Sequence, residues 1–330
     1  MPAIFNALPG FEVPMSSVLG TLASLWEMGK PGAKSAPSEF RASQMNLVLH
    51  LGHDHTPESA RRMFDAVLRF AQRYPCRIVA LCPRMSETGS DELGAKVFGE
   101  CYIGKSRAEM SCCEAVIVGY PNSQRGFLEN QVTTLIESDL PLYYWPSRVR
   151  SGPKIADYGF FLNQAKRIVI DSAIENETVL AFNWPKPENL RDLADARLLQ
   201  VRQSVGQFLS SYPPSELIRD LARVEIAAEP GLKAEAGFLR KWVEGNLRAC
   251  AEDSGGAVSE PVVEVRPSLE EGGSMAMAWV YTDGRSFTWS VDFESGRASI
   301  ESNLGGTRVS RSSIVRLLTT ERALGEALFF

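Results

Sequence analysis

The segment Gly99–Ser106 has the residue types and the spacing of a phosphate-binding loop. Its letters, GECYIGKS, fit the pattern G-x-x-x-x-G-K-[ST], in which Lys105 would contact the β- and γ-phosphates of a nucleotide and Ser106 would bind Mg²⁺. Asp171 ends a predicted strand and could complete the metal site. On this interpretation the chain is a nucleotide-binding NTPase of the P-loop type, which we keep as the alternative function.

The residues around this segment favour a β-turn at Gly104–Lys105 instead. A phosphate-binding loop needs a helix that begins at the Lys-Ser pair, so that free N–H groups face the phosphate. Residues 101–103 (Cys-Tyr-Ile) are bulky and β-favouring at positions where the backbone would have to wrap around an anion. The chain soon continues as another predicted strand around residues 114–118.

The three histidines of the chain, His50, His53 and His55, fall within six residues. Together with Asp54 they offer ligands of the kind that zinc or nickel binds. Side chains so close on one short loop rarely converge on a metal without distant partners, and the sequence has no further histidine to supply one. We therefore expect a polar strand-to-helix loop and no cofactor, with metal binding as the open alternative.

A predicted strand over residues 140–145 ends in bulky side chains, Tyr144 and Trp145, followed by Pro146. Open α/β sheets bind ligands at the carboxyl ends of their strands, and aromatic side chains there also suit a protein interface. We predict Tyr144, Trp145 and Pro146 as contacts for a partner protein. Ordinary core packing is the alternative for the same residues.

The six cysteines are irregularly spaced and include no CxxC motif, which favours reduced thiols in a cytosolic protein. Cys101 and Cys113 could face each other across a hairpin and are the candidate redox pair. No G-x-S-x-G motif and no G-x-G-x-x-G motif after a strand is present, so neither a hydrolase elbow nor a dinucleotide fingerprint is predicted.

Strands and helices alternate through the first half of the chain, which predicts an α/β domain with a mostly parallel sheet and one antiparallel hairpin. A smaller α+β domain with an antiparallel meander follows. The predicted domains are a helical arm and linker at 1–40, the α/β domain at 41–183 and the α+β domain at 184–330. The expected strands are 45–51, 77–82, 97–103, 111–120, 140–145, 167–171, 223–228, 261–266, 275–282, 285–293 and 297–301, and the expected helices are 14–28, 57–73, 124–138, 155–165, 186–209, 232–250 and 310–324.

The 330 residues carry 35 basic and 40 acidic side chains, for a net charge of −5, which argues against a general nucleic-acid binder. No apolar run reaches the length of about 20 residues that a membrane span needs. No charged segment precedes an apolar stretch at the start, so a secretory signal is not predicted. We expect a cytoplasmic protein that binds neither membranes nor nucleic acid.

Five stretches in this order resemble the OpcA family of glucose-6-phosphate dehydrogenase assembly proteins. They are MNLVLHLG (45–52), RYPCRIVAL (73–81), CCEAVIVGY (112–120), DLPLYYWP (139–146) and RIVIDSA (167–173). The resemblance implies a non-catalytic protein that binds glucose-6-phosphate dehydrogenase, promotes its active oligomer and supports the oxidative pentose phosphate pathway. The resemblance supplies no redox residue and no histidine site.

Overall fold

The computed structural model describes residues 4–27, 43–84, 92–103, 110–254, 262–268 and 274–330. The chain divides into two compact units, residues 1–192 together with 324–330, and residues 193–323. Each unit has a sheet and an apolar core of its own. The predicted domains stay predictions, with the ranges 1–40, 41–183 and 184–330. A domain is a segment that can fold alone, and a division of the chain by contacts does not test independent folding.

An eight-stranded sheet forms the centre of the first unit, in the order β1-β4-β5-β3-β2-β6-β7-β8. Neighbouring strands are parallel from β5 across to β8, whereas β4 is antiparallel to β5, and β1 is antiparallel to β4. The predicted mostly parallel sheet with an antiparallel hairpin is therefore confirmed. The strands are β1 (Phe11–Val13), β2 (Asn46–Leu51), β3 (Arg77–Arg84), β4 (Gly94–Ile103), β5 (Met110–Pro121), β6 (Leu142–Ser147), β7 (Arg167–Ile170) and β8 (Leu190–Asp192).

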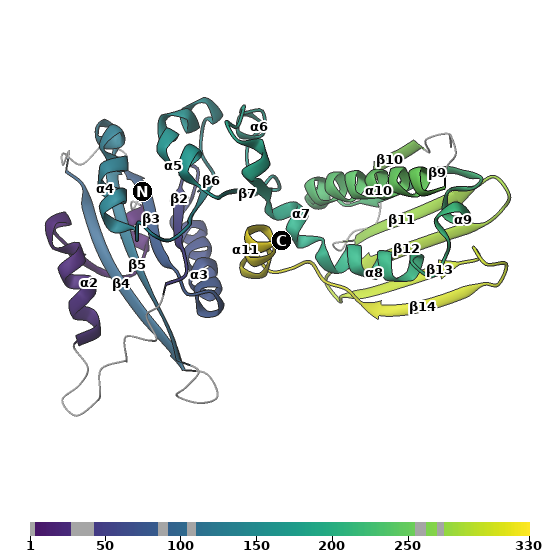
Figure 1. Ribbon diagram of the computed structural model, residues 1–330, viewed down its shortest axis with the longest axis horizontal. Coiled ribbons are helices and arrows are strands. Elements are labelled where there is room, and N and C mark those ends of the chain that lie inside the picture. Colours follow the sequence, from purple (N-terminus) through teal and green to yellow (C-terminus); the bar gives the residue numbers. More distant parts are fainter. Residues whose placement is uncertain (1–3, 28–42, 85–91, 104–109, 255–261, 269–273) are drawn as a thin grey trace. The chain divides into compact units, whose positions relative to one another are not determined.

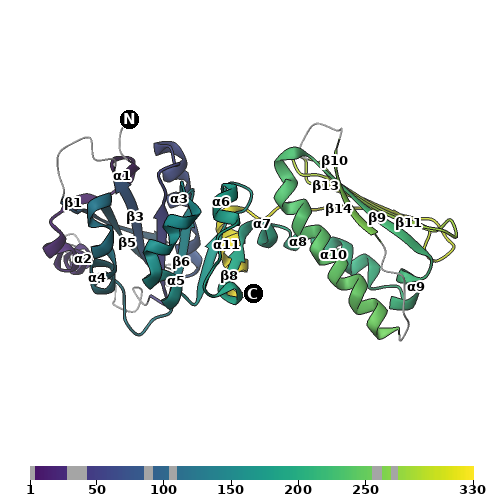
Figure 2. The same ribbon diagram turned by 90° about the horizontal axis from the view of Figure 1, so that it is seen from above.

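Helices lie on both faces of this sheet (Figures 1 and 2). Burial on both faces explains why the parallel strands read as nearly continuous apolar runs in the sequence. One face packs against α2 (Val18–Glu27), α4 (Leu128–Leu135), α5 (Gly159–Gln164) and α6 (Glu177–Leu180). On the opposite face lie α1 (Ile4–Ala7), α3 (Pro57–Arg73) and the end of α11 (Thr320–Phe329), whose Phe329 ring contacts Phe70, Tyr74 and Tyr143.

The start of α3 shows how the sequence sets a boundary. Thr56 is the N-cap: its side chain accepts a hydrogen bond from the Ser59 N–H, and the Ser59 hydroxyl accepts one from the Thr56 N–H. Pro57 occupies the first helical position, where its missing N–H costs nothing. Pro75 follows the last turn, and the helix predicted over residues 57–73 is confirmed.

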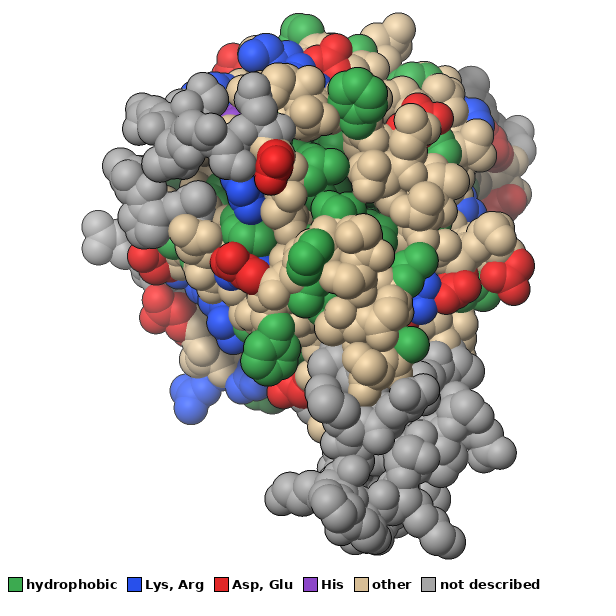
Figure 3. All heavy atoms as spheres, turned by 90° about the vertical axis from the view of Figure 1, so that its left-hand side faces the viewer, with side chains coloured by type: hydrophobic (Ala, Val, Ile, Leu, Met, Phe, Trp, Pro, Cys, Tyr) green, Lys and Arg blue, Asp and Glu red, His purple; other side chains and the backbone are tan. Residues whose placement is uncertain are grey.

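Exposed apolar side chains of the first unit include Phe11 on β1, Leu19 on α2 and Phe127 at the end of the 3₁₀ turn η5 (Asn122–Phe127), which are 71%, 49% and 56% exposed. Figure 3 looks at this unit from the side of α2 and β4, where apolar side chains lie among charged side chains of both signs. Across the described residues, no helix is both long enough and apolar enough to cross a bilayer.

The second unit has a six-stranded sheet in the order β10-β9-β11-β12-β13-β14. All neighbours are antiparallel except β9 and β10, so the predicted meander is confirmed. Buried and exposed residues alternate along β11, β12 and β13, and the buried face packs against α8 (Leu199–Leu209) and α10 (Lys233–Asp253). The strands are β9 (Leu221–Ala228), β10 (Val262–Pro267), β11 (Ser274–Tyr281), β12 (Ser286–Asp292), β13 (Arg297–Ser302) and β14 (Val309–Ile314).

Two predicted helices are wrong in part. Residues 186–209 contain β8 and α7 (Leu193–Arg197) before α8 begins, because the three residues of β8 pair in parallel with β7. Residues 310–324 include most of β14 (Val309–Ile314), which pairs with β13 from Arg297↔Ile314 to Ser302↔Val309, and α11 begins only at Thr320. In both segments, long-range strand pairing overrides a weak helical period.

Candidate functional site

A pocket of about 230 Å³ lies in the first unit where the carboxyl ends of β2, β3, β5 and β6 meet. The order β5-β3-β2-β6-β7-β8 runs outward in two directions from β2 and β6. The chain leaves β2 toward α3 on one face and leaves β6 toward α5 on the other. Connections that diverge in this way open a crevice at the sheet edge, which is where doubly wound sheets bind ligands.

A chain of hydrogen bonds forms the inner wall of the pocket. His50 is 2% exposed, and its Nδ1 lies 2.8 Å from the Tyr144 hydroxyl while its Nε2 lies 2.7 Å from the Tyr120 hydroxyl. The Tyr120 hydroxyl in turn lies 2.8 Å from the Tyr158 hydroxyl, and Tyr158 lines the pocket. The buried imidazole is thus connected to the cavity through two tyrosines.

His50 is neutral at physiological pH. Burial, followed by the charges of His53 and Arg125, lowers the pKa of His50 to about 3. A neutral imidazole donates from one ring nitrogen and accepts at the other, which matches one tyrosine hydroxyl at each nitrogen. Burial also raises the pKa values of Tyr120 and Tyr144 above the usual tyrosine range. The wall therefore presents neutral hydroxyl groups rather than charges.

The rim of the pocket is basic. Arg125 lies on η5, and Arg150 and Lys154 lie at the start of the segment that follows β6, which includes the 3₁₀ turn η6 (Gly152–Tyr158). Arg125 pairs with Asp157, and the Arg150 Nε lies 2.9 Å from an Asp54 carboxylate oxygen.

Among the described residues, no carboxylate lies within ion-pair distance of the Lys154 side chain, and no carboxylate lines the pocket. The positive rim acts on His53, which also lines the pocket. Burial lowers the pKa of His53, and a hydrogen bond with the Asn122 side chain partly offsets this decrease. The positive charges of Arg150, Arg125 and Lys154 lower the His53 pKa further.

Close backbone packing holds the two loops that form the crevice. A Cβ at Gly52, just after β2, would lie 2.1 Å from the Arg148 carbonyl oxygen, so only glycine fits there. Arg148 itself has a φ of +51°, and its N–H donates to Glu175 at 2.7 Å. Burial raises the pKa of the Glu175 carboxyl to about 7, opposed by the Arg148 N–H and aided by the charge of Asp171.

The histidines separate into two environments. His50 and His53 line the pocket, whereas His55 binds the Ser59 hydroxyl at 2.9 Å and the Ser147 hydroxyl at 3.1 Å. Among the described residues, no three His, Cys, Asp or Glu side chains are grouped so that they could hold a metal ion.

The predicted partner contacts Tyr144, Trp145 and Pro146 lie in β6 and are all buried. The Tyr144 ring stacks on Phe161 with centroids 4.9 Å apart. Their contact with a partner protein stays a prediction, and their burial is a reason to seek the partner surface elsewhere.

The P-loop-like segment begins inside a strand. Gly99–Ile103 belong to β4 and pair antiparallel with β5, whose first residue, Met110, is opposite Ile103. Gly104, Lys105 and Ser106 lie outside the described residues. Because residues 99–103 form a paired strand rather than a loop that wraps around an anion, the described part of the segment differs from a phosphate-binding loop.

The same hairpin corrects two cysteine predictions, the pairing of Cys101 with Cys113 and the expectation of reduced thiols throughout. Cys101 lies directly opposite Cys112, with their Cα atoms 4.0 Å apart, and the two form a disulfide. The predicted partner, Cys113, is a buried free thiol whose pKa burial raises to about 12. A shift of one residue in a strand moves a side chain to the opposite face, so the sequence had the right hairpin with the register off by one.

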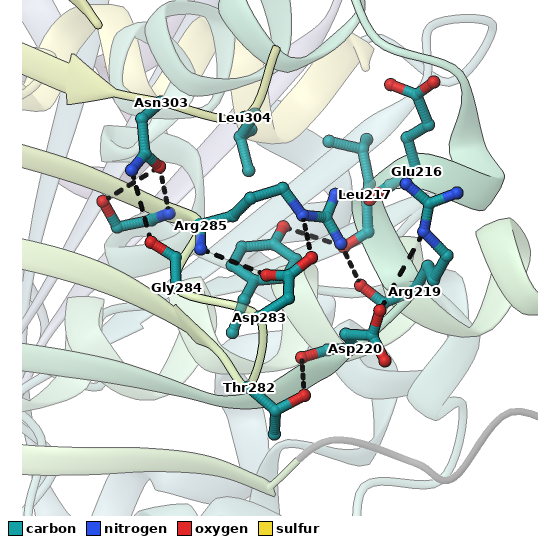
Figure 4. Close-up of polar contacts among 12 residues, drawn as sticks. Glu216, Leu217, Arg219, Asp220, Thr282, Asp283, Gly284, Arg285, Asn303 and Leu304 are labelled. Carbon is teal, nitrogen blue, oxygen red and sulfur yellow. Dashed lines mark hydrogen bonds and ion pairs between the residues drawn. The ribbon is translucent and has the colours of Figure 1, made fainter. Parts of the chain in front are cut away.

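A second polar cluster lies in the second unit, around Arg285 (Figure 4). The Arg285 guanidinium donates to the carbonyl oxygens of Glu216 at 2.8 Å and Arg219 at 2.5 Å, and its Nε donates to Asp283 at 2.6 Å. It also lies over the Tyr281 ring, 4.6 Å from the centroid. These contacts bind the end of α9 (Pro214–Ile218) to the β11–β12 hairpin and indicate a structural role.

Sequence reasoning missed most of the pocket. Tyr120 and Tyr158 were not singled out, and neither were the cations Arg125, Arg150 and Lys154. A usable signal was present, since Tyr120 ends a predicted strand and Arg150 follows another. The rule that polar residues after parallel strands converge at one edge could have selected them.

Residues 68–183 match the family model described as "Glucose-6-phosphate dehydrogenase subunit N-terminal domain". The chain is 28% identical over 190 residues to a Synechococcus elongatus protein described as "Putative OxPP cycle protein OpcA", a match that covers 54% of this chain and 40% of that relative. The chain thus matches less than half the length of this relative. A crystal structure described as a "putative nadph-dependent oxidoreductase" from Desulfitobacterium hafniense DCB-2 aligns with a TM-score of 0.42 and 9% identity over 86% of each chain, a likeness too distant to support an argument.

Proposed function

We propose that this chain is a member of the OpcA family, on the match of residues 68–183, and that it binds glucose-6-phosphate dehydrogenase, promotes the active oligomer of that enzyme and raises its activity. On this proposal the chain is not an enzyme itself and acts in the cytoplasm, in the oxidative pentose phosphate pathway. An activator of this kind must bind the active state of its target more tightly than the inactive state.

The match of residues 68–183 carries the proposal. This range holds β3 to β7, which form most of the parallel sheet and three of the four strand ends around the pocket. The chemistry of the pocket agrees with a binding role, because His50 has its pKa lowered to about 3 and both ring nitrogens next to tyrosine hydroxyls. Such an imidazole is a poor general base at neutral pH.

Exposed apolar side chains on the first unit are the more suitable contacts for the dehydrogenase. Phe127 is 56% exposed and lies within the family-matched range, between η5 and α4. Exposed aromatic side chains contribute strongly to protein interfaces. Leu180, also in that range and 45% exposed, lies on α6 and provides a matched control, because leucine is under-represented among the side chains that dominate interface energies.

The test combines this protein with glucose-6-phosphate dehydrogenase from the same organism. We expect a larger particle by light scattering and a higher dehydrogenase rate when the two are mixed. Phe127→Ser should weaken the complex about tenfold or more, whereas Leu180→Ser should leave it nearly unchanged. If neither the particle mass nor the rate changes on mixing, the proposed function is wrong; equal effects of the two variants would refute only the placement of the surface.

A further inference from the structure

We propose that the pocket at the carboxyl ends of β2, β3, β5 and β6 binds a small phosphorylated metabolite of about the size of a sugar phosphate. The phosphate would lie at the basic rim formed by Arg125, Arg150 and Lys154, and the hydroxyl-bearing part would lie against Tyr120 and Tyr158. This site is independent of the proposed function, because it requires only the first unit of this chain.

The charge of the rim selects an anion. Three cations and no carboxylate line the cavity among the described residues, and the carboxylates that pair with Arg125 and Arg150 are not part of the lining. Lys154 is exposed and has no ion-pair partner within the described chain. The Arg125 Nε is buried without a hydrogen-bond partner. The exposed Lys154 ammonium is therefore available to phosphate oxygens, which ammonium and guanidinium groups bind with charge-assisted hydrogen bonds.

The inner wall selects a polar, uncharged group beside the anion. The hydroxyls of Tyr120 and Tyr158 are joined at 2.8 Å, and each hydroxyl can donate one bond and accept others. Ser151 and Asn122 add further polar groups to the lining. A ligand with several hydroxyls would satisfy these groups, whereas a purely apolar ligand would leave them unpaired in a partly buried site.

The volume limits the ligand. A cavity of about 230 Å³ is smaller than the roughly 300–1,000 Å³ of most drug-sized ligand sites, so it suits a single phosphorylated ring or short chain rather than a dinucleotide. The crevice is also preformed, because Gly52 packs against the Arg148 carbonyl and fixes the two loops relative to each other. A preformed site loses less entropy when the ligand binds.

His53 provides a direct reporter of the bound anion. Nearby Arg150, Arg125 and Lys154 help to lower its pKa, so a phosphate placed among these cations should raise it again. His55 does not line the pocket, and it serves as an internal reference. Because the chain has three histidines in total, their side-chain NMR signals can be assigned by substituting them one at a time.

The experiment titrates the full chain, without the dehydrogenase, with inorganic phosphate, glucose 6-phosphate and glucose, followed by calorimetry and by histidine NMR. We expect glucose 6-phosphate to bind at least tenfold more tightly than inorganic phosphate, and glucose to show no binding. The His53 pKa should rise on binding while the His55 pKa stays constant. Lys154→Ala should weaken binding about tenfold, and the matched variant Lys166→Ala, an exposed lysine outside the pocket, should not.

Several outcomes would overturn the site. If neither inorganic phosphate nor glucose 6-phosphate bound at millimolar concentration, the proposed site would be wrong. Equal affinity for inorganic phosphate and glucose 6-phosphate would reduce it to a general anion site and overturn the sugar-phosphate assignment. If Lys154→Ala and Lys166→Ala weakened ligand binding equally, the loss would come from long-range electrostatic attraction and not from contact between Lys154 and the ligand. None of these results bears on complex formation with the dehydrogenase, so the two proposals can fail separately.

Discussion

The polar clusters of the two units differ in what their donors do. In the second unit, Arg285 directs its guanidinium at the carbonyls of Glu216 and Arg219 and at the Asp283 carboxylate, so its donors are used within the fold. In the first unit, Lys154 lines a cavity and has no ion-pair partner among the described residues, and the Arg125 Nε is buried without a hydrogen-bond partner. A closed network stabilises a structure, whereas an open one is free to bind a ligand.

The topology of the two sheets explains this difference. Parallel strands need crossover connections, and the connections after β2 and β6 leave on opposite faces and open a crevice. The antiparallel meander from β11 to β14 is joined by short turns such as Asp283–Gly284, which bring polar groups together locally. The stability of the first unit should therefore depend on the packing of its crevice, and that of the second unit on its hydrogen-bond network.

The largest effect is expected from Gly52→Ala, because the new Cβ would lie 2.1 Å from the Arg148 carbonyl oxygen, which is backbone and cannot move aside cheaply. We expect a loss of about 3 kcal/mol in the free energy of unfolding of the first unit, the upper end for overpacking. Urea denaturation followed by hydrogen exchange, peptide by peptide, measures this for each unit. Gly20→Ala in α2, where a Cβ meets nothing within 4 Å, should stabilise by about 0.5–1 kcal/mol. Similar losses for both variants would contradict the packing argument.

Arg285→Ala should destabilise the second unit by about 2 kcal/mol, because it removes charge-assisted hydrogen bonds to two carbonyls and the contact with the Tyr281 ring. The same urea and hydrogen-exchange measurement should find the first unit unchanged. Arg248→Ala, on the exposed side of α10, is the control and should change the stability by less than about 0.5 kcal/mol. An effect of Arg285→Ala no larger than that of the control would mean that the network is not structural.

The sequence was most informative where local chemistry and tertiary structure agree. The Thr56-Pro57 start of α3 and the apolar runs of β2, β3 and β5 could be identified because caps and burial leave a direct mark on residue type. Strands β8 and β14 could not, since short strands are defined by pairing with β7 and β13 rather than by a period of their own. The pocket was missed for the same reason: Tyr120, Arg125 and Lys154 are distant in sequence and meet only through the strand order.

Acidification should weaken the first unit selectively, because the second unit contains no histidine. Burial lowers the pKa of His50 to about 3 and that of His55 to about 4, so between pH 6 and 5 only the unfolded chain protonates them. Glu175 has the opposite effect on the pH dependence of stability. Its pKa is raised to about 7 in the folded chain, so between pH 6 and 5 the folded chain holds a proton on Glu175 that the unfolded chain mostly lacks.

His50 and His55 set against Glu175 leave a net difference of about one proton, which predicts a loss of about 1.4 kcal/mol per pH unit as the pH falls from 6 to 5. His53, whose pKa is also lowered in the folded chain, adds to this loss. Unfolding free energies of each unit at pH 6 and pH 5, from hydrogen exchange corrected for intrinsic rates, check this. A pH-independent first unit, or an equal loss in the second, would show that these histidines are not buried as neutral groups.

Glu175→Gln should have the smallest effect at neutral pH, under about 1 kcal/mol, because the amide oxygen can still accept the Arg148 N–H and no buried charge is created. Its consequence appears on acidification. With the opposing carboxyl removed, the protons that the unfolded chain binds at the histidines remain uncompensated, so the slope between pH 6 and 5 should steepen by about 1.4 kcal/mol per pH unit. An unchanged slope would mean that Glu175 is ionised in the folded chain. The Arg148 N–H would then donate to a buried charged carboxylate instead of a neutral carboxyl group.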